Sequence, residues 1–216
     1  MASVMLATYP EVFAGGAIIA GLPYGSATTI PEAFDRMRGH GGPSEQDLQR
    51  LLRGASQHHD RWPRISIWHG SADRTVAHSN AEAIVGQWRG VHKLGKSPTL
   101  TQVADGQSRR VWCDADGTEL LEAHTIAGMG HGTPLNTKGN DGLGTPAPFM
   151  LDVGISSTRH IANFWGIAAS GNPAASRTET APRSPRRELA AASPELASTG
   201  VRKIIEDALR SAGLMG

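Results

Sequence analysis

The chain has 216 residues, a formal net charge of +1 at pH 7, 39% hydrophobic residues and one cysteine. That length suits one domain with a tail, and so small a net charge excludes strong attraction to nucleic acid or to an anionic membrane. No apolar run of the sequence approaches the roughly 20 residues that cross a bilayer. Cys113, standing alone, excludes an intrachain disulfide and a cysteine-based zinc site, and we expect a packed side chain rather than a thiol nucleophile.

The first part of the chain predicts a helix, a buried strand and a helical segment. Residues 2–8 predict a helix, and residues 12–20 are continuously apolar, which suits a strand buried on both faces of a parallel sheet. Residues 24–60 interrupt the β pattern with a short helix after Pro31 and a second helix capped by Ser44. We expect this segment to form a lid-like helical insertion.

The middle of the chain predicts three strands and a further helix. Residues 64–69 form the next buried strand, and residues 79–91 follow as a helix. Residues 108–113 and 118–126 flank Asp114–Gly117, a turn sequence that is typical of a β-hairpin. Strands that alternate with helices indicate an α/β fold.

The last part of the chain predicts a loop, a helix and a tail. A loop rich in glycine and proline runs to about Phe149, and Ser156 or Ser157 then caps a helix. Residues 169–200 contain almost no large apolar side chain, so we expect them to be disordered. Residues 201–213 predict a short amphipathic helix, which is a candidate surface for a protein partner.

An acid and a histidine each follow a predicted strand. Asp73 ends the segment 64–73, and His131 lies in the glycine-rich segment 126–135. An acid and then a histidine are the last two members of the α/β-hydrolase order Ser–Asp–His. In such a triad the carboxylate orients the imidazole and stabilises its protonated form. The alternative is a turn aspartate and a loop histidine that do not meet.

The serine of such a triad has no clear candidate, because no Gly-x-Ser-x-Gly turn occurs in the sequence. Ser3 belongs to a predicted helix and Ser71 to the acid turn, so neither is expected to be the nucleophile. A metal cluster of His58, His59 and Asp60 is also disfavoured, because adjacent side chains point apart. We therefore expect no metal and no cofactor.

Two further sets of side chains have both a functional and a structural interpretation. The tryptophans are Trp68, Trp88 and Trp165. They could line an acyl or polymer groove, but their strand and helix positions favour core packing. The arginines of the tail are Arg183, Arg186 and Arg187. They could bind an acidic partner, but a solvated disordered run is the simpler interpretation.

Four segments together resemble the polyhydroxybutyrate (PHB) depolymerase-like esterase family, of which feruloyl and acetylxylan esterases are near relatives. The segments are 2–15, 20–24, 67–76 and 128–134. They occur in the expected order, and the resemblance covers most of residues 1 to about 167. It implies a partial α/β-hydrolase fold over residues 1–168, with a mainly parallel sheet and flanking helices. It also implies that Asp73 is the triad acid and His131 the triad base.

The resemblance implies where the missing parts lie. In this family the nucleophile elbow runs directly into a helix like residues 1–8, so the serine, the oxyanion donors and the upstream strands are expected to precede Met1. Relatives often have a cysteine where Ser26 stands, so their disulfide is not expected here. The complete family member is expected to be extracellular, whereas this chain shows no signal peptide and is expected in the cytoplasm as written.

The expected function is that of a carboxylic-ester hydrolase with a Ser–Asp–His mechanism. Its substrate is a polyhydroxyalkanoate, a feruloyl ester or an acetyl ester, among which the sequence does not choose. Because the serine is absent, the 216 residues as written are expected to be inactive. The alternative function is a non-catalytic remnant or a binding module that retains the cleft.

Overall fold

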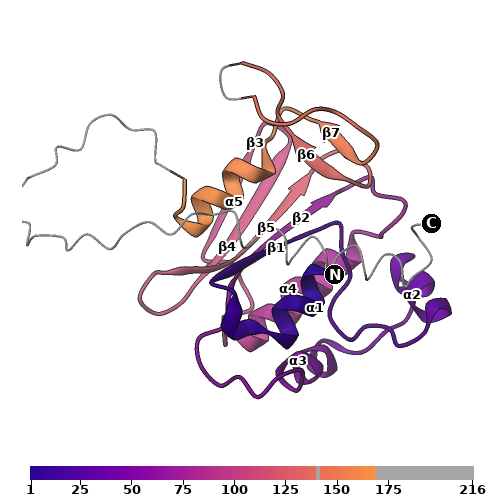
Figure 1. Ribbon diagram of the computed structural model, residues 1–216, viewed down its shortest axis with the longest axis vertical. Helices are drawn as coiled ribbons and strands as arrows, with labels where there is room; N and C mark the ends of the chain where they lie inside the picture. The colour runs from indigo at the N-terminus through magenta and orange to yellow at the C-terminus, as the bar shows by residue number, and fades with distance from the viewer. Residues whose placement is uncertain (140–141, 169–216) are drawn as a thin grey trace, which may run out of the picture. The chain divides into compact units, whose positions relative to one another are not determined.

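The computed structural model describes residues 1–139 and 142–168, which form a five-stranded sheet with helices against it (Figure 1). The strands of this sheet are β1 (Gly15–Ile19), β2 (Arg64–Gly70), β3 (Leu100–Ala104), β4 (Gln107–Cys113) and β5 (Glu119–Ile126). The helices are α1 (Ala2–Thr8), the 3-10 turn η1 (Pro10–Val12), α2 (Ile30–Met37), α3 (Glu45–Arg53), α4 (Ser79–Val91) and α5 (Ser157–Trp165). The expectations for residues 169–200 and 201–213 lie outside the described residues.

The sheet has the strand order β1-β2-β5-β4-β3. β1, β2 and β5 pair in parallel, whereas β4 is antiparallel to both β5 and β3, so only β4 runs against the others in this sheet. The expectation of a mainly parallel sheet is therefore confirmed. Gly70 at the end of β2 is paired with Ile126 at the end of β5, so the two loops that follow leave the sheet side by side.

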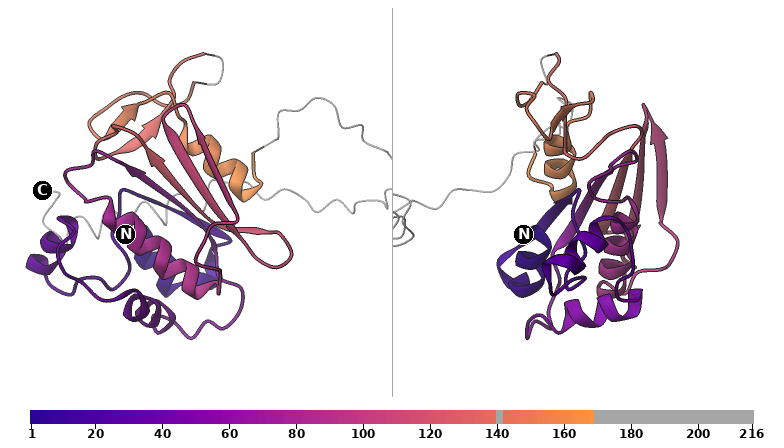
Figure 2. Two further views of the ribbon diagram at one scale, coloured as in Figure 1. Left: turned by 180° about the vertical axis from the view of Figure 1, so that it is seen from behind. Right: turned by 90° about the vertical axis from the view of Figure 1, so that its right-hand side faces the viewer.

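Helices cover both faces of the sheet (Figures 1 and 2), and side chains that alternate along the central strands build a separate core on each face. Ile65 and Ile67 of β2 pack with residues of α1, α3 and α4, including Trp88. Trp68 points to the opposite face, where it packs with Ile161 of α5. No helix of the described residues is both long and apolar enough to cross a membrane.

β1 differs from the expected strand at residues 12–20. The strand begins only at Gly15, because the chain first makes the 3-10 turn η1. Its burial alternates, with Gly16 and Ile18 buried but Ala17 and Ile19 only partly buried. The prediction that this strand is buried on both faces was therefore wrong. The second face of β1 is covered only in part, by the cluster that includes Trp165.

The lid-like segment at residues 24–60 divides into two parts with different neighbours. α3, capped by the Ser44 hydroxyl, packs beside α4, where Gln87 Nε2 donates to the Leu48 carbonyl at 2.8 Å. α2 has no buried residue and is held to the segment that follows Asp73, because Ala77 N donates to the Met37 carbonyl at 2.7 Å. Only α2 is thus placed near the acid turn.

Three strands were not predicted. β3 carries no burial signal, because all five of its residues are exposed. The loop expected between His131 and Phe149 contains β6 (Thr133–Leu135), which pairs in parallel with β7 (Met150–Asp152). These strands have three residues each, too few to show a period in the sequence.

Candidate active site

The turn after β2 is joined to the loop after β5 by main-chain hydrogen bonds. Ser71 N donates to the Ile126 carbonyl at 2.9 Å, and Ala72 N donates to the Met129 carbonyl at 3.0 Å. Gly70 is required at this crossing, because a Cβ there would lie 2.1 Å from the Met129 oxygen. The backbone alone therefore brings the two loops together.

Asp73 has a fully buried side chain whose two oxygens have different partners. Oδ1 accepts from the backbone N–H groups of Thr75 and Val76, both at 2.8 Å. Oδ2 accepts from His131 Nδ1 at 2.8 Å. A carboxylate can only accept, so Nδ1 carries the proton and Nε2 is the basic nitrogen of neutral His131. The two amides of the turn fix the plane of the carboxylate.

His131 sits where a base could reach a second reactant. Its side chain is 27% exposed, and no hydrogen bond within residues 1–139 and 142–168 engages Nε2. The Phe149 ring lies edge-on at 5.8 Å between ring centroids. Gly132 has a φ of 155°, and a Cβ there would lie 2.6 Å from the Phe149 oxygen, so this loop also requires a glycine. The sequence prediction that Asp73 and His131 meet matches this geometry.

His69 is a member of the site that the sequence did not reveal. Its side chain is buried, and Nε2 donates to the Val76 carbonyl at 2.8 Å while lying 3.5 Å from Asp73 Oδ2. Burial lowers the pKa of His69, which favours the neutral ring. The available signal was a histidine within an apolar strand, directly before Gly70.

The remaining candidates make structural contacts. Ser3 Oγ donates to the Leu22 carbonyl at 2.9 Å, and Ser71 Oγ accepts from Gly128 N at 2.9 Å, so Ser71 braces the histidine loop. Within the described part of the chain, no group of three His, Cys, Asp or Glu side chains is arranged to hold a metal. His58 Nε2 lies 3.1 Å from the Arg61 carbonyl.

The tryptophans pack in the two cores, as predicted. Trp68 and Trp88 are fully buried, and Trp165 is partly buried against the cluster around Trp68. Trp68 also stacks on the His124 ring, with 3.7 Å between the ring centroids. Cys113 is free and partly buried. The three tail arginines lie outside the described residues.

No protein-family model matches the chain, but comparison with known proteins finds relatives named as a depolymerase, as acetylxylan esterases and as feruloyl esterases. Over 169 residues the chain is 41% identical to poly(3-hydroxyalkanoate) depolymerase C of Paucimonas lemoignei. This alignment covers 77% of this chain and 41% of that protein. Over 141 residues it is 31% identical to an acetylxylan esterase of Coprinopsis cinerea. That alignment covers 62% of this chain and 37% of that protein. The chain thus spans less than half the length of these two relatives.

A solved structure supports the fold. The acetyl xylan esterase from Aspergillus awamori superposes with a TM-score of 0.59 at 20% sequence identity, covering 77% of this chain and 55% of that one. The two molecules therefore share an arrangement of helices and strands. The described sheet and helices correspond to a part of that larger fold.

Proposed function

We propose that the chain belongs to the PHB depolymerase-like esterase family, to whose members it is similar, and that Asp73 and His131 are the acid and the base of a Ser–His–Asp site for carboxylic-ester hydrolysis. The observation that carries this proposal is the 2.8 Å hydrogen bond from His131 Nδ1 to Asp73 Oδ2. It fixes the tautomer that a general base needs and leaves Nε2 accessible.

The chemistry follows from this arrangement. His131 Nε2 takes the proton of a serine hydroxyl as that oxygen attacks the ester carbonyl, and then delivers the proton to the departing alcohol. The Asp73 carboxylate, held by Thr75 N and Val76 N, stabilises the imidazolium between these two steps. Water then attacks the acyl-enzyme by the same route. This mechanism uses no metal and no cofactor.

The 216 residues of this chain do not provide an evident nucleophile. No Gly-x-Ser-x-Gly turn occurs among the 216 residues, and Ser3 and Ser71 are engaged in structural hydrogen bonds. We propose that these residues alone do not hydrolyse esters by the triad route, and that a segment with the serine and its oxyanion donors completes the site. A binding module that retains the cleft is the alternative.

The substrate class proposed first is a polyester of 3-hydroxyalkanoates. The relative named for that substrate is more similar to this chain than the acetylxylan esterase is, at 41% against 31% identity. Acetyl and feruloyl esters are the other proposed substrates, since the same triad would serve all three. For the complete protein we propose an extracellular location, where an insoluble polyester would be met.

A chimera tests this function. The 216 residues should show no triad-type turnover of p-nitrophenyl butyrate, whereas a fusion behind the nucleophile-bearing segment of the 41% identical relative should. His131→Ala in the chimera should then lower kcat by about 10³- to 10⁴-fold. His59→Ala, at an exposed position, is the matched control. Chimera turnover that survives His131→Ala would contradict the proposal.

A further inference from the structure

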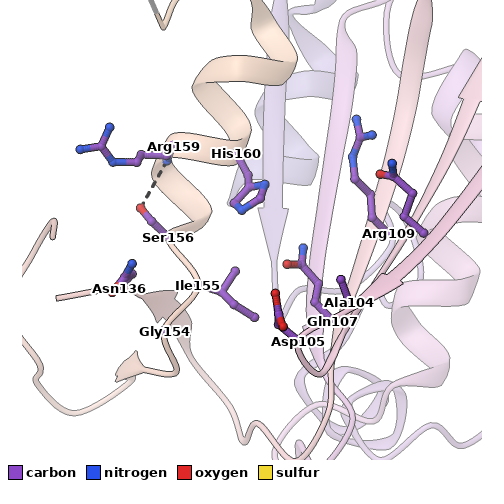
Figure 3. Close-up of a pocket in the computed structure, with 11 residues that line it drawn as sticks. Ala104, Asp105, Gln107, Arg109, Asn136, Gly154, Ile155, Ser156, Arg159 and His160 are labelled. Atoms are coloured by element: carbon purple, nitrogen blue, oxygen red, sulfur yellow. Dashed lines mark hydrogen bonds between the residues drawn. The ribbon is translucent and has the colours of Figure 1, made fainter. Parts of the chain in front are cut away.

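The hollow between β4 and α5 is not part of the candidate active site, because neither Asp73 nor His131 lines it (Figure 3). Arg109 in that hollow is already neutralised by two carboxylates. A substrate of His131 therefore meets other side chains, those that surround the imidazole itself. One of them is Phe149, whose ring packs edge-on against the imidazole.

Two short parallel strands place Phe149 beside His131. Thr133, which begins β6, pairs with Met150, which begins β7 (Figure 1). His131 lies two residues before β6, and Phe149 lies one residue before β7. Thr133 N donates to the Phe149 carbonyl at 2.7 Å, so main-chain atoms hold this position. The ring centroids of Phe149 and His131 are consequently 5.8 Å apart.

The backbone of Phe149 adopts a conformation that suits glycine. Ala147 and Met150 exchange main-chain hydrogen bonds of 3.2 and 2.9 Å across a tight turn. Pro148 is the second residue of this turn, and Phe149 is the third, with a φ of 64°. A type II turn has this arrangement and favours proline at the second position and glycine at the third. The bulky side chain at the third position therefore strains the turn.

Burial does not account for a phenylalanine at this position. Phe149 is 63% exposed, so the ring adds little to either core. Among the described residues, the others with a positive φ that are not glycine are Ala20, Lys93 and Asp105, and none of these is a large apolar side chain. Strain of this kind is found where a residue serves a site. The exposed ring beside His131 is thus a candidate substrate contact.

The proposed mechanism indicates which part of the substrate reaches this ring. His131 Nε2 delivers a proton to the departing alcohol, so the alcohol oxygen comes within about 3 Å of Nε2. The Phe149 ring, 5.8 Å from the imidazole between centroids, is then within reach of the first carbons of the alcohol. The acyl chain begins one bond further from that oxygen. The alcohol part of the ester is therefore the nearer neighbour of the ring.

From this geometry we propose that Phe149 is a specificity-determining residue, which contacts the alcohol part of the ester and favours an apolar alcohol. The ring gains free energy by covering alkyl carbons and offers no hydrogen bond to a polar alcohol. Such a preference fits a polyester of 3-hydroxyalkanoates, in which the departing group is a secondary alkyl alcohol. The inference rests on the proposed function, because it concerns the same histidine.

The chimera tests this preference with three esters, whose hydrolysis is followed by proton release. Methyl butyrate is the reference, hexyl butyrate extends the alcohol, and methyl hexanoate extends the acyl chain. Phe149→Gly should lower the ratio of kcat/KM for hexyl butyrate to that for methyl butyrate by about fivefold or more. The ratio for methyl hexanoate to methyl butyrate should stay within about twofold of its original value.

Two further variants of the chimera are the controls. Phe149→Tyr keeps the ring and should keep both ratios. Lys93→Gly relieves strain of the same kind, at an exposed residue with a φ of 59° after α4, and should change neither ratio. A loss of rate that is common to all three esters cancels in the ratios, so a general disturbance of His131 is not mistaken for a change of preference.

The melting temperature of the 216-residue chain separates this role from a structural one. Because glycine relieves the strained turn, Phe149→Gly should leave the melting temperature unchanged or raise it by up to about 3 °C. A fall of more than about 1 °C would mean that the ring supports the fold, and would overturn the proposal.

The two proposals fail in different ways. An active chimera in which Phe149→Gly leaves the hexyl ratio unchanged, or lowers the acyl ratio as much, would overturn this inference and leave the esterase function in place. A chimera that hydrolyses none of the three esters would contradict the esterase function, and with it this inference.

Discussion

Two buried carboxylates with histidine neighbours lie in this molecule, and they are held in different ways. Asp73 accepts hydrogen bonds from two backbone N–H groups and from His131, and His69 Nε2 lies 3.5 Å from its Oδ2. Glu122 is surrounded by side chains, namely Ser66, Arg109 and His124. His131 is 27% exposed, whereas the side chain of His124 is fully buried. A buried carboxylate beside a histidine is therefore part of a pair with a partly exposed imidazole in one region and of a buried side-chain network in the other.

The comparison predicts that the side-chain network depends more on each single member. Arg109→Leu leaves Glu122 as a buried charge without its cation, which should lower the free energy of unfolding by about 3 kcal/mol, the lower end of the range for breaking a buried pair. Arg110→Leu, which removes a half-exposed pair with Glu82, should cost under about 1 kcal/mol. Urea unfolding of both variants measures the difference. Equal losses would mean that Glu122 is not isolated from water.

The two regions should also lose stability in different ranges of pH. Burial lowers the pKa of His69 from its ordinary 6.5, so its contribution is complete above that value and is lost as the pH falls below it. For Glu122, burial raises the pKa, but hydrogen bonds from His124, Ser66 and Arg109 together bring it below the ordinary 4.5. The contribution of Glu122 is therefore present above 4.5 and is lost only in stronger acid.

His92 shows how much stability one buried histidine can lose as the pH falls. Burial lowers its pKa from 6.5 to about 4, which at 1.36 kcal/mol per unit is at most about 3 kcal/mol of unfolding free energy lost over that range. Urea unfolding between about pH 7.5 and pH 4 should show a shallower decline in His92→Gln and in His69→Gln than in the native chain. An identical decline in all three proteins would show that neither ring is desolvated.

The hydrogen bond between Asp73 and His131 should be visible directly. The proton on His131 Nδ1 should give a strongly downfield ¹H NMR resonance, because it lies between the ring and a buried carboxylate. Asp73→Asn should abolish this resonance and cost about 1–2 kcal/mol of stability. Asp35→Asn, at a side chain that is 55% exposed, is the control. A resonance that persists in Asp73→Asn would contradict the assignment.

The smallest effect is expected at the brace of the histidine loop. Ser71→Ala removes the acceptor of Gly128 N and should cost about 0.5–1 kcal/mol, with faster hydrogen exchange at that amide. Ser97→Ala is the matched control, because no described hydrogen bond involves that hydroxyl. Unchanged exchange at Gly128 would mean that the other main-chain bonds hold the loop unaided.

The sequence predicted the Asp73–His131 contact more completely than the side-chain network around Glu122, for a physical reason. Asp73 and His131 follow parallel strands, and parallel strands place the loops at their carboxyl ends on one edge of the sheet. No comparable rule brings Arg109 to Glu122, since that contact depends on the register of an antiparallel pair. His69 was missed because its partner is a backbone carbonyl, that of Val76, and no residue type marks such a partner.

The secondary structure shows the same dependence on context. Helices with an apolar face and a cap, such as α3 and α5, were predicted because both signals are local. β3 was not predicted, because it is formed by pairing with β4 alone and buries none of its side chains. The start of β1 shifted to Gly15 because a 3-10 turn took the preceding residues.

The crossing of the two loops at Gly70 and Met129 has a consequence for inheritance and design. The bonds that bring Asp73 and His131 together are made by main-chain atoms, and those atoms are the same for every amino acid except proline, which has no N–H to donate. Mutation to residues other than proline can therefore replace Ala72 or Met129 without removing the main-chain hydrogen bond that joins the two loops. The unit that could be moved to another protein is the parallel pair of β2 and β5 with the first residues of the loops that follow them. Within this unit Gly70 tolerates no substitution, because a Cβ there would meet the Met129 oxygen.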